Sequence, residues 1–171
     1  MAKNFDSMED SNRSSNASIH DISDPSRRTV LRGSAAVAIG SLLAGCALPG
    51  AIGAKLAEPD VPVVAVVGDG GFMYTVQELM TAIELQLPIP VIIWNNDCLA
   101  MIRDGMDAND IPRMAIHPLA PDFPKLAQAF GCQSAAPNSK AELVECVKRA
   151  LADKGPTLIV INEDSGWLTA E

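Results

Sequence analysis

Two turns in the sequence carry side chains that could hold a cation beside a phosphate. Asp69 lies between Gly68 and Gly70, and Asn96 lies within the run Asn95-Asn96-Asp97. Glycines on both sides of Asp69 let backbone amides approach a phosphate while the carboxylate reaches a cation. A carboxylate, an amide oxygen and a backbone carbonyl suit Mg²⁺, whose remaining ligands come from a diphosphate and water. The residues alone leave a second interpretation open, because Gly-Asp-Gly is a common turn and Asn-Asn-Asp a common end to a strand.

The elements around these turns would bring them to one edge of a sheet. Residues 61–67 and 89–94 are almost continuously apolar, which predicts two buried strands, and each strand ends at one of the turns. Between them, Thr75 predicts an N-cap with Glu78 at the capping-box spacing, followed by a helix that reaches Leu87. Sequential parallel strands are often neighbours, so we expect Asp69 and Asn96 to converge at the carboxyl edge of the sheet.

The rest of the chain continues the alternation of helices and strands. A helix of small residues is expected at 48–57, and Ala and Gly there would allow close packing. A short helix at 99–106 is followed by a loop at 107–121, in which His117 is expected at the surface. A helix at 122–130 ends at Gly131, and a short strand near Cys132, a helix at 140–153 and a strand at 157–161 follow. This pattern predicts an α/β fold with three layers, a mostly parallel sheet flanked by helices.

Composition excludes several classes of partner and site. The 171 residues suffice for one domain with a core, and the formal charge of −8 argues against nucleic acid or an anionic membrane as the main partner. The acidic excess lies in residues 34–171, which hold 16 acids and 8 bases. Four unevenly spaced cysteines and two histidines do not fit a disulfide scaffold or a His-rich zinc site.

The first 46 residues have a different character from the rest. Residues 1–25 are polar and predict disorder. Residues 26–46 place Arg27-Arg28 ahead of an uncharged run that ends in Leu43-Ala44-Gly45-Cys46. This layout is typical of a twin-arginine export signal with a lipoprotein cleavage box, which would give a lipid anchor at Cys46 and a membrane or periplasmic location. The alternative is a basic tail ahead of a buried helix rich in Ala and Gly.

Four segments together resemble one enzyme family. Residues 47–57 (ALPGAIGAKLA), 63–72 (VVAVVGDGGF), 76–79 (VQEL) and 94–96 (WNN) are similar to the diphosphate-binding domain of thiamine-diphosphate enzymes. The interval of 27 residues from Asp69 to Asn96 is the spacing of that family's signature. The resemblance covers residues 47–168 and leaves 169–171 as a tail.

The resemblance implies a cofactor site but no catalytic residue within this chain. It implies that Asp69, the Asn96 side chain and the main-chain oxygen of Cys98 hold Mg²⁺. It also implies that thiamine diphosphate is bound by a set that includes these residues and their neighbours: Gly68, Asp69, Gly70, Gly71, Phe72, Asn96, Cys98, Leu99 and Met101.

Within the family, the chain is most similar to acetolactate synthases and 2-oxo acid decarboxylases. Residues 121–127 and 156–168 resemble decarboxylases that act on 5-guanidino-2-oxopentanoate. Gly105 stands where acetolactate synthases usually carry a tryptophan, and Ile102 stands where enzymes of the pyruvate decarboxylase type usually carry an acid. The identity of the 2-oxo acid, and the choice between decarboxylase and carboligase, therefore stay open.

The resemblance also implies what this chain would need from elsewhere. In the family, a glutamate of a separate pyrimidine-binding domain, usually on another subunit, activates the cofactor. We expect residues 1–46 to lack that domain and the cofactor-binding fold to be incomplete at its N-terminal end. The chain alone would then be inactive or nearly so and would bind the cofactor weakly, with a homo-oligomer or a partner supplying the missing domain. An exposed apolar face is expected where those domains pack.

Two hypotheses follow for the whole chain. The first is the C-terminal part of a cytoplasmic 2-oxo acid decarboxylase or carboligase. The second is a non-catalytic, exported or lipid-anchored chimeric protein, whose fate is set by residues 1–46.

Overall fold

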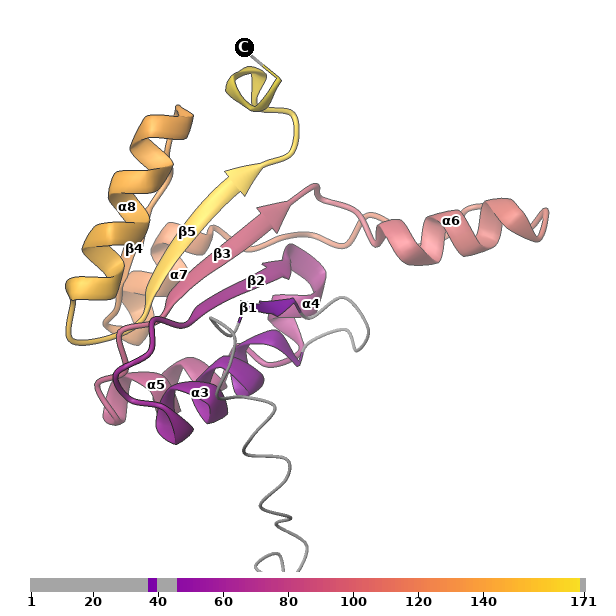
Figure 1. Ribbon diagram of the computed structural model, residues 1–171. Coiled ribbons are helices and arrows are strands. Elements are labelled where there is room, and N and C mark those ends of the chain that lie inside the picture. Colours follow the sequence, from indigo (N-terminus) through magenta and orange to yellow (C-terminus); the bar gives the residue numbers. More distant parts are fainter. Residues whose placement is uncertain (1–36, 40–45, 170–171) are drawn as a thin grey trace, which may run out of the picture. The chain divides into compact units, whose positions relative to one another are not determined.

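The computed structural model describes residues 37–39 and 46–169, and these form a five-stranded parallel sheet (Figure 1). The strand order is β1-β2-β3-β5-β4. The strands are β1 (Val37–Ile39), β2 (Val64–Gly68), β3 (Pro90–Asn95), β4 (Gln133–Ala135) and β5 (Thr157–Asn162). The predicted α/β fold with a parallel sheet is confirmed.

Helices cover both faces of this sheet. The helices are α3 (Ala47–Ala57), α4 (Asp69–Met73), α5 (Glu78–Glu84), α6 (Ala100–Ala108), α7 (Phe123–Phe130), α8 (Lys140–Ala152) and the 3₁₀ turn η3 (Gly166–Leu168). Successive residues of β5 serve opposite faces, because side chains alternate along a strand. Leu158 belongs to the core cluster that α3, α5 and α7 share, whereas Ile159 packs with Cys146 and Ala150 of α8. The three predicted layers are therefore present.

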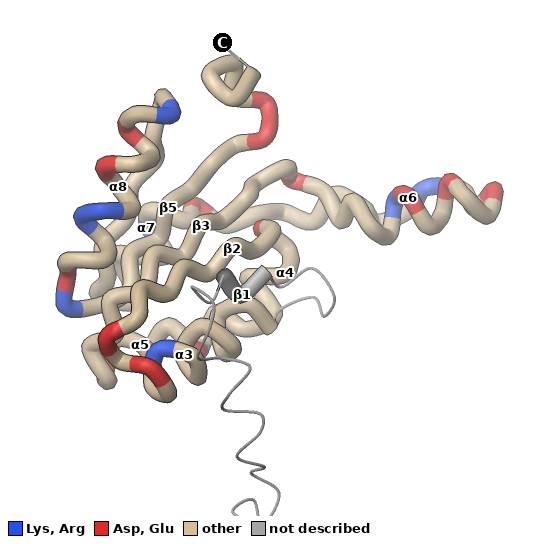
Figure 2. Tube along the Cα trace, viewed as in Figure 1, with Lys and Arg blue, Asp and Glu red and all other residues tan. Residues whose placement is uncertain are grey.

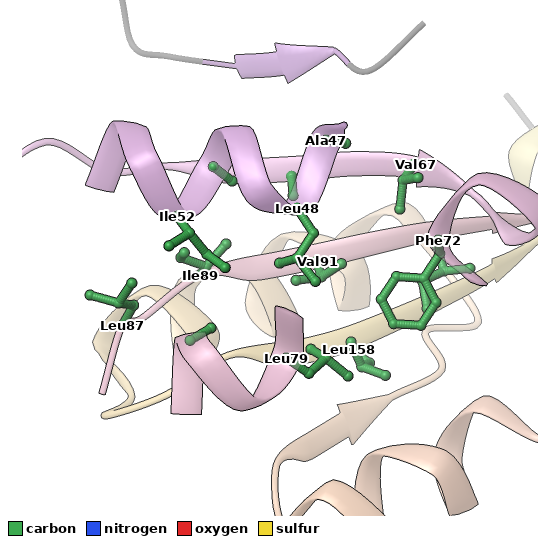
Figure 3. Packing of buried hydrophobic residues seen from close by; sticks show 14 of the residues in the cluster. Ala47, Leu48, Ile52, Val67, Phe72, Leu79, Leu87, Ile89, Val91 and Leu158 are labelled. Carbon is green, nitrogen blue, oxygen red and sulfur yellow. The ribbon is translucent and has the colours of Figure 1, made fainter. Parts of the chain in front are cut away.

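The larger core cluster fixes the strands that end at the candidate site. Leu48 of α3 lies over Val91 of β3, Ile52 of α3 lies beside Ile89, and Leu79 of α5 lies beside Leu158 of β5 (Figure 3). Burying one such aliphatic side chain contributes roughly 1.5–3 kcal/mol, so β2 and β3 are held firmly together. Phe72 lies at the end of the same cluster, immediately after the end of β2.

Helix α3 confirms the predicted helix of small residues, but its glycines do not serve close packing. Ala47 and Ala51 are fully buried against the sheet. A Cβ atom added at Gly50 or Gly53 would meet no described atom within 4 Å. The buried alanines therefore provide the close contact that the sequence analysis had also ascribed to glycine.

Two local predictions in the segment after β2 were wrong. Gly68 acts as the N-cap of α4, so the Gly-Asp-Gly segment opens a short helix rather than a free turn. Helix α5 starts at Glu78 with Gln77 at its N-cap and without a side-chain cap, so Thr75 is not the N-cap residue. A turn in which Glu78 N–H donates to the Thr75 carbonyl, at 2.9 Å, precedes the helix and delays its start.

The predictions for the last third of the chain are confirmed closely. Asp122 caps α7 by accepting a hydrogen bond from the Lys125 amide at 3.1 Å, and Gly131 ends that helix with a left-handed φ of 82°. Ser139 caps α8 in the same way through the Glu142 amide. Local capping signals were sufficient here, because each helix begins and ends within its own sequence.

Most of the predicted leader, residues 1–36 and 40–45, lies outside the described residues. The exceptions are Cys46 and β1, whose residues Val37–Ile39 pair in parallel with residues 64–66. An uncharged apolar run suits either the hydrophobic part of an export signal or a strand, and these three residues form a strand. No helix in the described part of the chain has the length and apolar character needed to cross a bilayer.

Candidate functional site

The ends of β2 and β3 bring the two predicted turns together. Gly68 of β2 is paired with Trp94 of β3 in the parallel ladder, so Asp69 and Asn95 both follow at the same edge of the sheet. Asn95 is in turn paired with Asn162 at the end of β5. Figure 2 shows acidic positions along this edge. The predicted convergence of the Asp69 and Asn96 turns is confirmed.

Asp69 is a buried carboxylate at the start of α4. Its exposed fraction is 6%, and no Lys or Arg in the described part of the chain forms an ion pair with it. Burial raises the pKa of Asp69, and the negative charge of Asp97 raises it further. Backbone hydrogen bonds from Gly70, Asp69 itself and Asp97 oppose this rise. A cation beside Asp69 would supply the missing positive charge and favour its ionised form.

The second half of the site is a tight loop at the end of β3. Asn96 Oδ1 accepts a hydrogen bond from the Cys98 amide at 3.1 Å. Asp97, between them, has a left-handed φ of 49°, an uncommon conformation for a residue other than glycine. Since an amide oxygen carries two lone pairs, Asn96 can keep this bond and still contact a cation.

A polar recess lies beside this loop and includes residues that the sequence analysis missed. It has a volume of about 460 Å³ and is lined by the loop and the end of β5: Asn95, Asn96, Asp97, Asn162, Glu163 and Asp164. Asn95 donates through Nδ2 to Asn162 Oδ1 at 3.0 Å, whereas its buried Oδ1 has no hydrogen-bond partner among the described residues. The Asn doublet could have singled out Asn95, but only the strand order brings Asn162 to it.

An apolar recess of about 210 Å³ lies on the Asp69 side of the site. Of the residues predicted to bind the cofactor, Asp69, Gly70 and Leu99 line it. The other lining residues were not predicted from the sequence: Met73, Tyr74, Pro118, Leu119, Ala120, Pro121 and Phe123. Most of these come from the loop after α6, whose return to the sheet has no local sequence signal.

Gly70 lies close to the tip of the Leu99 side chain. A Cβ atom at this position would lie 2.8 Å from Leu99 Cδ2, closer than van der Waals contact allows. At Gly68, by contrast, the nearest atom to an added Cβ is the Trp94 carbonyl oxygen at 4.0 Å. Gly70 thus lets the start of α4 pack against the segment after the Asn96 loop. From the sequence, this glycine was expected to let the backbone approach a phosphate instead.

The remaining predicted residues lie at varied distances from these recesses. Cys98 is buried, and Gly71 is partly buried within α4. Phe72 is fully buried and meets Phe123 edge to face, with ring centroids 5.9 Å apart. Met101 lies on α6 with 78% of its surface exposed and lines neither recess. The structure therefore groups Asp69, Gly70, Asn96, Cys98 and Leu99, and it places Phe72 in the core and Met101 on the surface.

The donor atoms at this edge fit a hard divalent cation. A carboxylate at Asp69, an amide oxygen at Asn96 and a main-chain oxygen at Cys98 are the oxygen types that Mg²⁺ prefers. No group of three or more His, Cys, Asp or Glu side chains suited to a metal ion occurs in the described ranges. The proposed set is compatible with this finding, because the Asn96 amide oxygen and the Cys98 main-chain oxygen are not His, Cys, Asp or Glu side-chain atoms.

Comparison with known proteins identifies the family of this fold. Residues 23–161 match the family model described as "Thiamine pyrophosphate enzyme, C-terminal TPP binding domain". The chain is 46% identical to the probable 2-ketoarginine decarboxylase AruI of Pseudomonas aeruginosa, over 67% of this chain and 21% of that protein. It is 34% identical to acetolactate synthase of Bacillus subtilis, over 70% of this chain and 21% of that protein.

Solved structures give the same answer for the fold. A thiamine diphosphate-dependent 4-hydroxybenzoylformate decarboxylase of Rhodococcus jostii superposes with a TM-score of 0.64 and 31% identity, over 69% of this chain and 23% of that one. The benzoylformate decarboxylase of Polynucleobacter necessarius also gives 0.64, with 26% identity over 70% of this chain and 23% of that one. The present chain thus spans about a fifth of the length of the curated relatives it matches.

The extent of the family match also bears on residues 1–46. The match begins at residue 23, within the segment predicted as a leader. Neither this match nor the pairing of β1 in the sheet supports an export signal there.

Proposed function

This chain belongs to the thiamine pyrophosphate enzyme family through its C-terminal TPP-binding domain, and from that premise we propose that Asp69, Asn96 and Cys98 hold the Mg²⁺ that anchors thiamine diphosphate. One observation carries the proposal: Asp69 is buried, and has no basic partner among residues 46–169, at a strand end that adjoins the Asn96 loop. A divalent cation would satisfy that carboxylate, and the diphosphate would complete the coordination of the cation.

The residues around the cation have distinct parts in this proposal. Asp69 supplies the negative charge, and Asn96 and Cys98 supply neutral oxygens. The apolar recess beside Asp69 would keep water from part of the site, which strengthens electrostatic contacts there. The chemistry that the cofactor supplies when bound is addition to the carbonyl of a 2-oxo acid, followed by loss of CO₂.

For the reaction of the assembled enzyme, we propose decarboxylation or carboligation of a 2-oxo acid. The 46% identity to a probable 2-ketoarginine decarboxylase favours a guanidino 2-oxo acid, and the identity to acetolactate synthase supports the carboligase alternative. We further propose that a partner chain supplies the pyrimidine-binding domain, in the cytoplasm, and that this chain without its partner has little or no activity. A lipid anchor at Cys46 is the competing expectation, and incorporation of labelled lipid at that residue would favour it.

Calorimetric titration with thiamine diphosphate, with and without Mg²⁺, tests the cation site. The native chain should bind only with Mg²⁺, and Asp69→Ala should weaken binding by about 100-fold, which is about 2.7 kcal/mol. Asp69→Asn keeps the size of the side chain without its charge and should lose binding to a similar degree. Absence of Mg²⁺-dependent binding by the native chain would refute the proposal.

The thermal midpoint, Tm, of the cation-free variants separates lost binding from lost folding. Since burial raises the pKa of Asp69 in the fold, the ionised carboxylate destabilises the cation-free protein as the pH rises through that pKa. At neutral pH, Asp69→Asn should therefore leave Tm unchanged or raise it by about 2–4 °C. Asp164→Asn is a matched control, because it makes the same change at the same edge of the sheet in a residue that is not a proposed ligand.

A further inference from the structure

We propose that His117 is a positioning residue, which holds the backbone of Asp97 so that Asn96 and Cys98 are presented together to a cation. The inference rests on the proposed function of those two residues. From the sequence alone, His117 was expected only to lie at the surface.

The first observation is a hydrogen bond between distant parts of the chain. His117 Nδ1 lies 2.8 Å from the Asp97 carbonyl oxygen, across 20 residues of sequence. A carbonyl oxygen only accepts hydrogen bonds, so the proton must be on Nδ1. The imidazole is exposed, and its role is therefore in this directed contact rather than in the core.

The second observation is the conformation of Asp97. Its φ of 49° is left-handed, so a contact must keep its backbone from relaxing to an ordinary conformation. The Asp97 backbone lies close enough to the Asp69 carboxyl to lower the pKa of that group, and the Asp97 carbonyl receives the His117 proton. Asp97 thus lies beside both halves of the candidate site, and the His117 hydrogen bond acts on its carbonyl.

The third observation is the anchoring of the segment that carries His117. Ile116 is 6% exposed, whereas residues 109–115 and 117–119 on either side of it are exposed. The Ile116 carbonyl accepts a hydrogen bond from the Leu99 amide at 2.8 Å. After β3 ends at Asn95, the chain forms α6 and then returns, and residues 116–117 are held next to residues 97–99 by this hydrogen bond and the His117 hydrogen bond (Figure 1).

These contacts predict what loss of the His117 donor would do. The Asn96–Cys98 hydrogen bond and the Leu99–Ile116 hydrogen bond would stay, so the fold should be kept. The Asp97 carbonyl would turn to water, and its left-handed backbone could relax. Asn96 Oδ1 and the Cys98 carbonyl would then sample arrangements that do not suit one cation, which would weaken binding without unfolding the protein.

Three variants of the full chain test this role. His117→Leu removes the donor, and His117→Asn restores one, because the Asn Nδ2 group can donate from nearly the same place as His Nδ1. Met114→Ala is the matched control, since Met114 is an exposed residue of the same segment, residues 99–117, and lines neither recess. The measurements are the calorimetric affinity for thiamine diphosphate with Mg²⁺, Tm without the cation, and hydrogen exchange of the amides of residues 97–99 without the cation.

We expect His117→Leu to weaken binding about tenfold and to speed exchange at residues 97–99, with Tm within about 1 °C of native. His117→Asn should bind within about threefold of the native chain, and Met114→Ala should match it. The inference is overturned if His117→Leu binds and exchanges like the native chain, or if His117→Asn is as impaired as His117→Leu. If the native chain shows no Mg²⁺-dependent binding, the proposed function fails, and unchanged exchange in His117→Leu would still separately refute the positioning role.

Discussion

The two halves of the candidate site are supported in opposite ways. Asp69 immediately follows β2 as the first residue of α4, and Phe72 anchors that helix in the core three residues later. Asn96 and Cys98 lie in a loop whose backbone is tied to residues 116 and 117, on the far side of an exposed helix. The first half is formed by neighbouring residues that pack into the core. The second half depends on contacts with residues 116 and 117, which are about 20 residues further along the chain.

This difference separates stability from binding. Changes to the core residues next to Asp69 should lower the free energy of unfolding, because they remove buried apolar surface. Changes in α6 should leave the free energy of unfolding nearly unchanged, because no residue of α6 is buried. Three substitutions, in order of expected effect, test this contrast.

The largest effect is expected from Phe72→Ala. The ring is fully buried and packs on Phe123, so its removal should cost about 3–5 kcal/mol in the free energy of unfolding. Urea denaturation measures this loss, with Met73→Ala as the control on the neighbouring, more exposed position of α4. A loss below about 1 kcal/mol would show that α4 is not anchored by the core.

A smaller effect is expected from Gly70→Ala, where the two halves meet. The new methyl group would press on the tip of Leu99, which can shift, so the cost should be about 1 kcal/mol. Adding Leu99→Ala should remove most of that cost, and a double-mutant cycle measures the coupling. Gly105→Ala in α6, where a Cβ meets no described atom within 4 Å, should instead stabilise the chain slightly. Additive effects of the first pair would argue against this contact.

The smallest effect is expected from Met101→Ala on α6. Its side chain is largely exposed, so the free energy of unfolding should change by less than about 0.5 kcal/mol. Other large apolar side chains are exposed on α6 and in the loop after it as well: Ile102, Ile111, Met114 and Leu119. A Tm clearly lower than native in Met101→Ala would mean that α6 packs against the domain in solution.

Local sequence was sufficient wherever structure is made by neighbours along the chain. The apolar runs predicted β2, β3 and β5, and Gly131 marked the end of α7. Local signals misled at Thr75, where a turn delays the start of α5. They also misled at residues 37–39, whose uncharged context suits an export signal as well as a strand.

The sequence by itself predicted that Asp69 and Asn96 would directly follow two parallel strands, because the order of apolar and polar residues gives the length and spacing of those strands. Only the tertiary structure decided that β5 rather than β4 lies beside β3, which brings Asn162 to Asn95. It alone placed His117 against Asp97 and the residues after α6 beside Asp69. Contacts between segments far apart in the chain depend on how all the elements pack, and no local pattern encodes them.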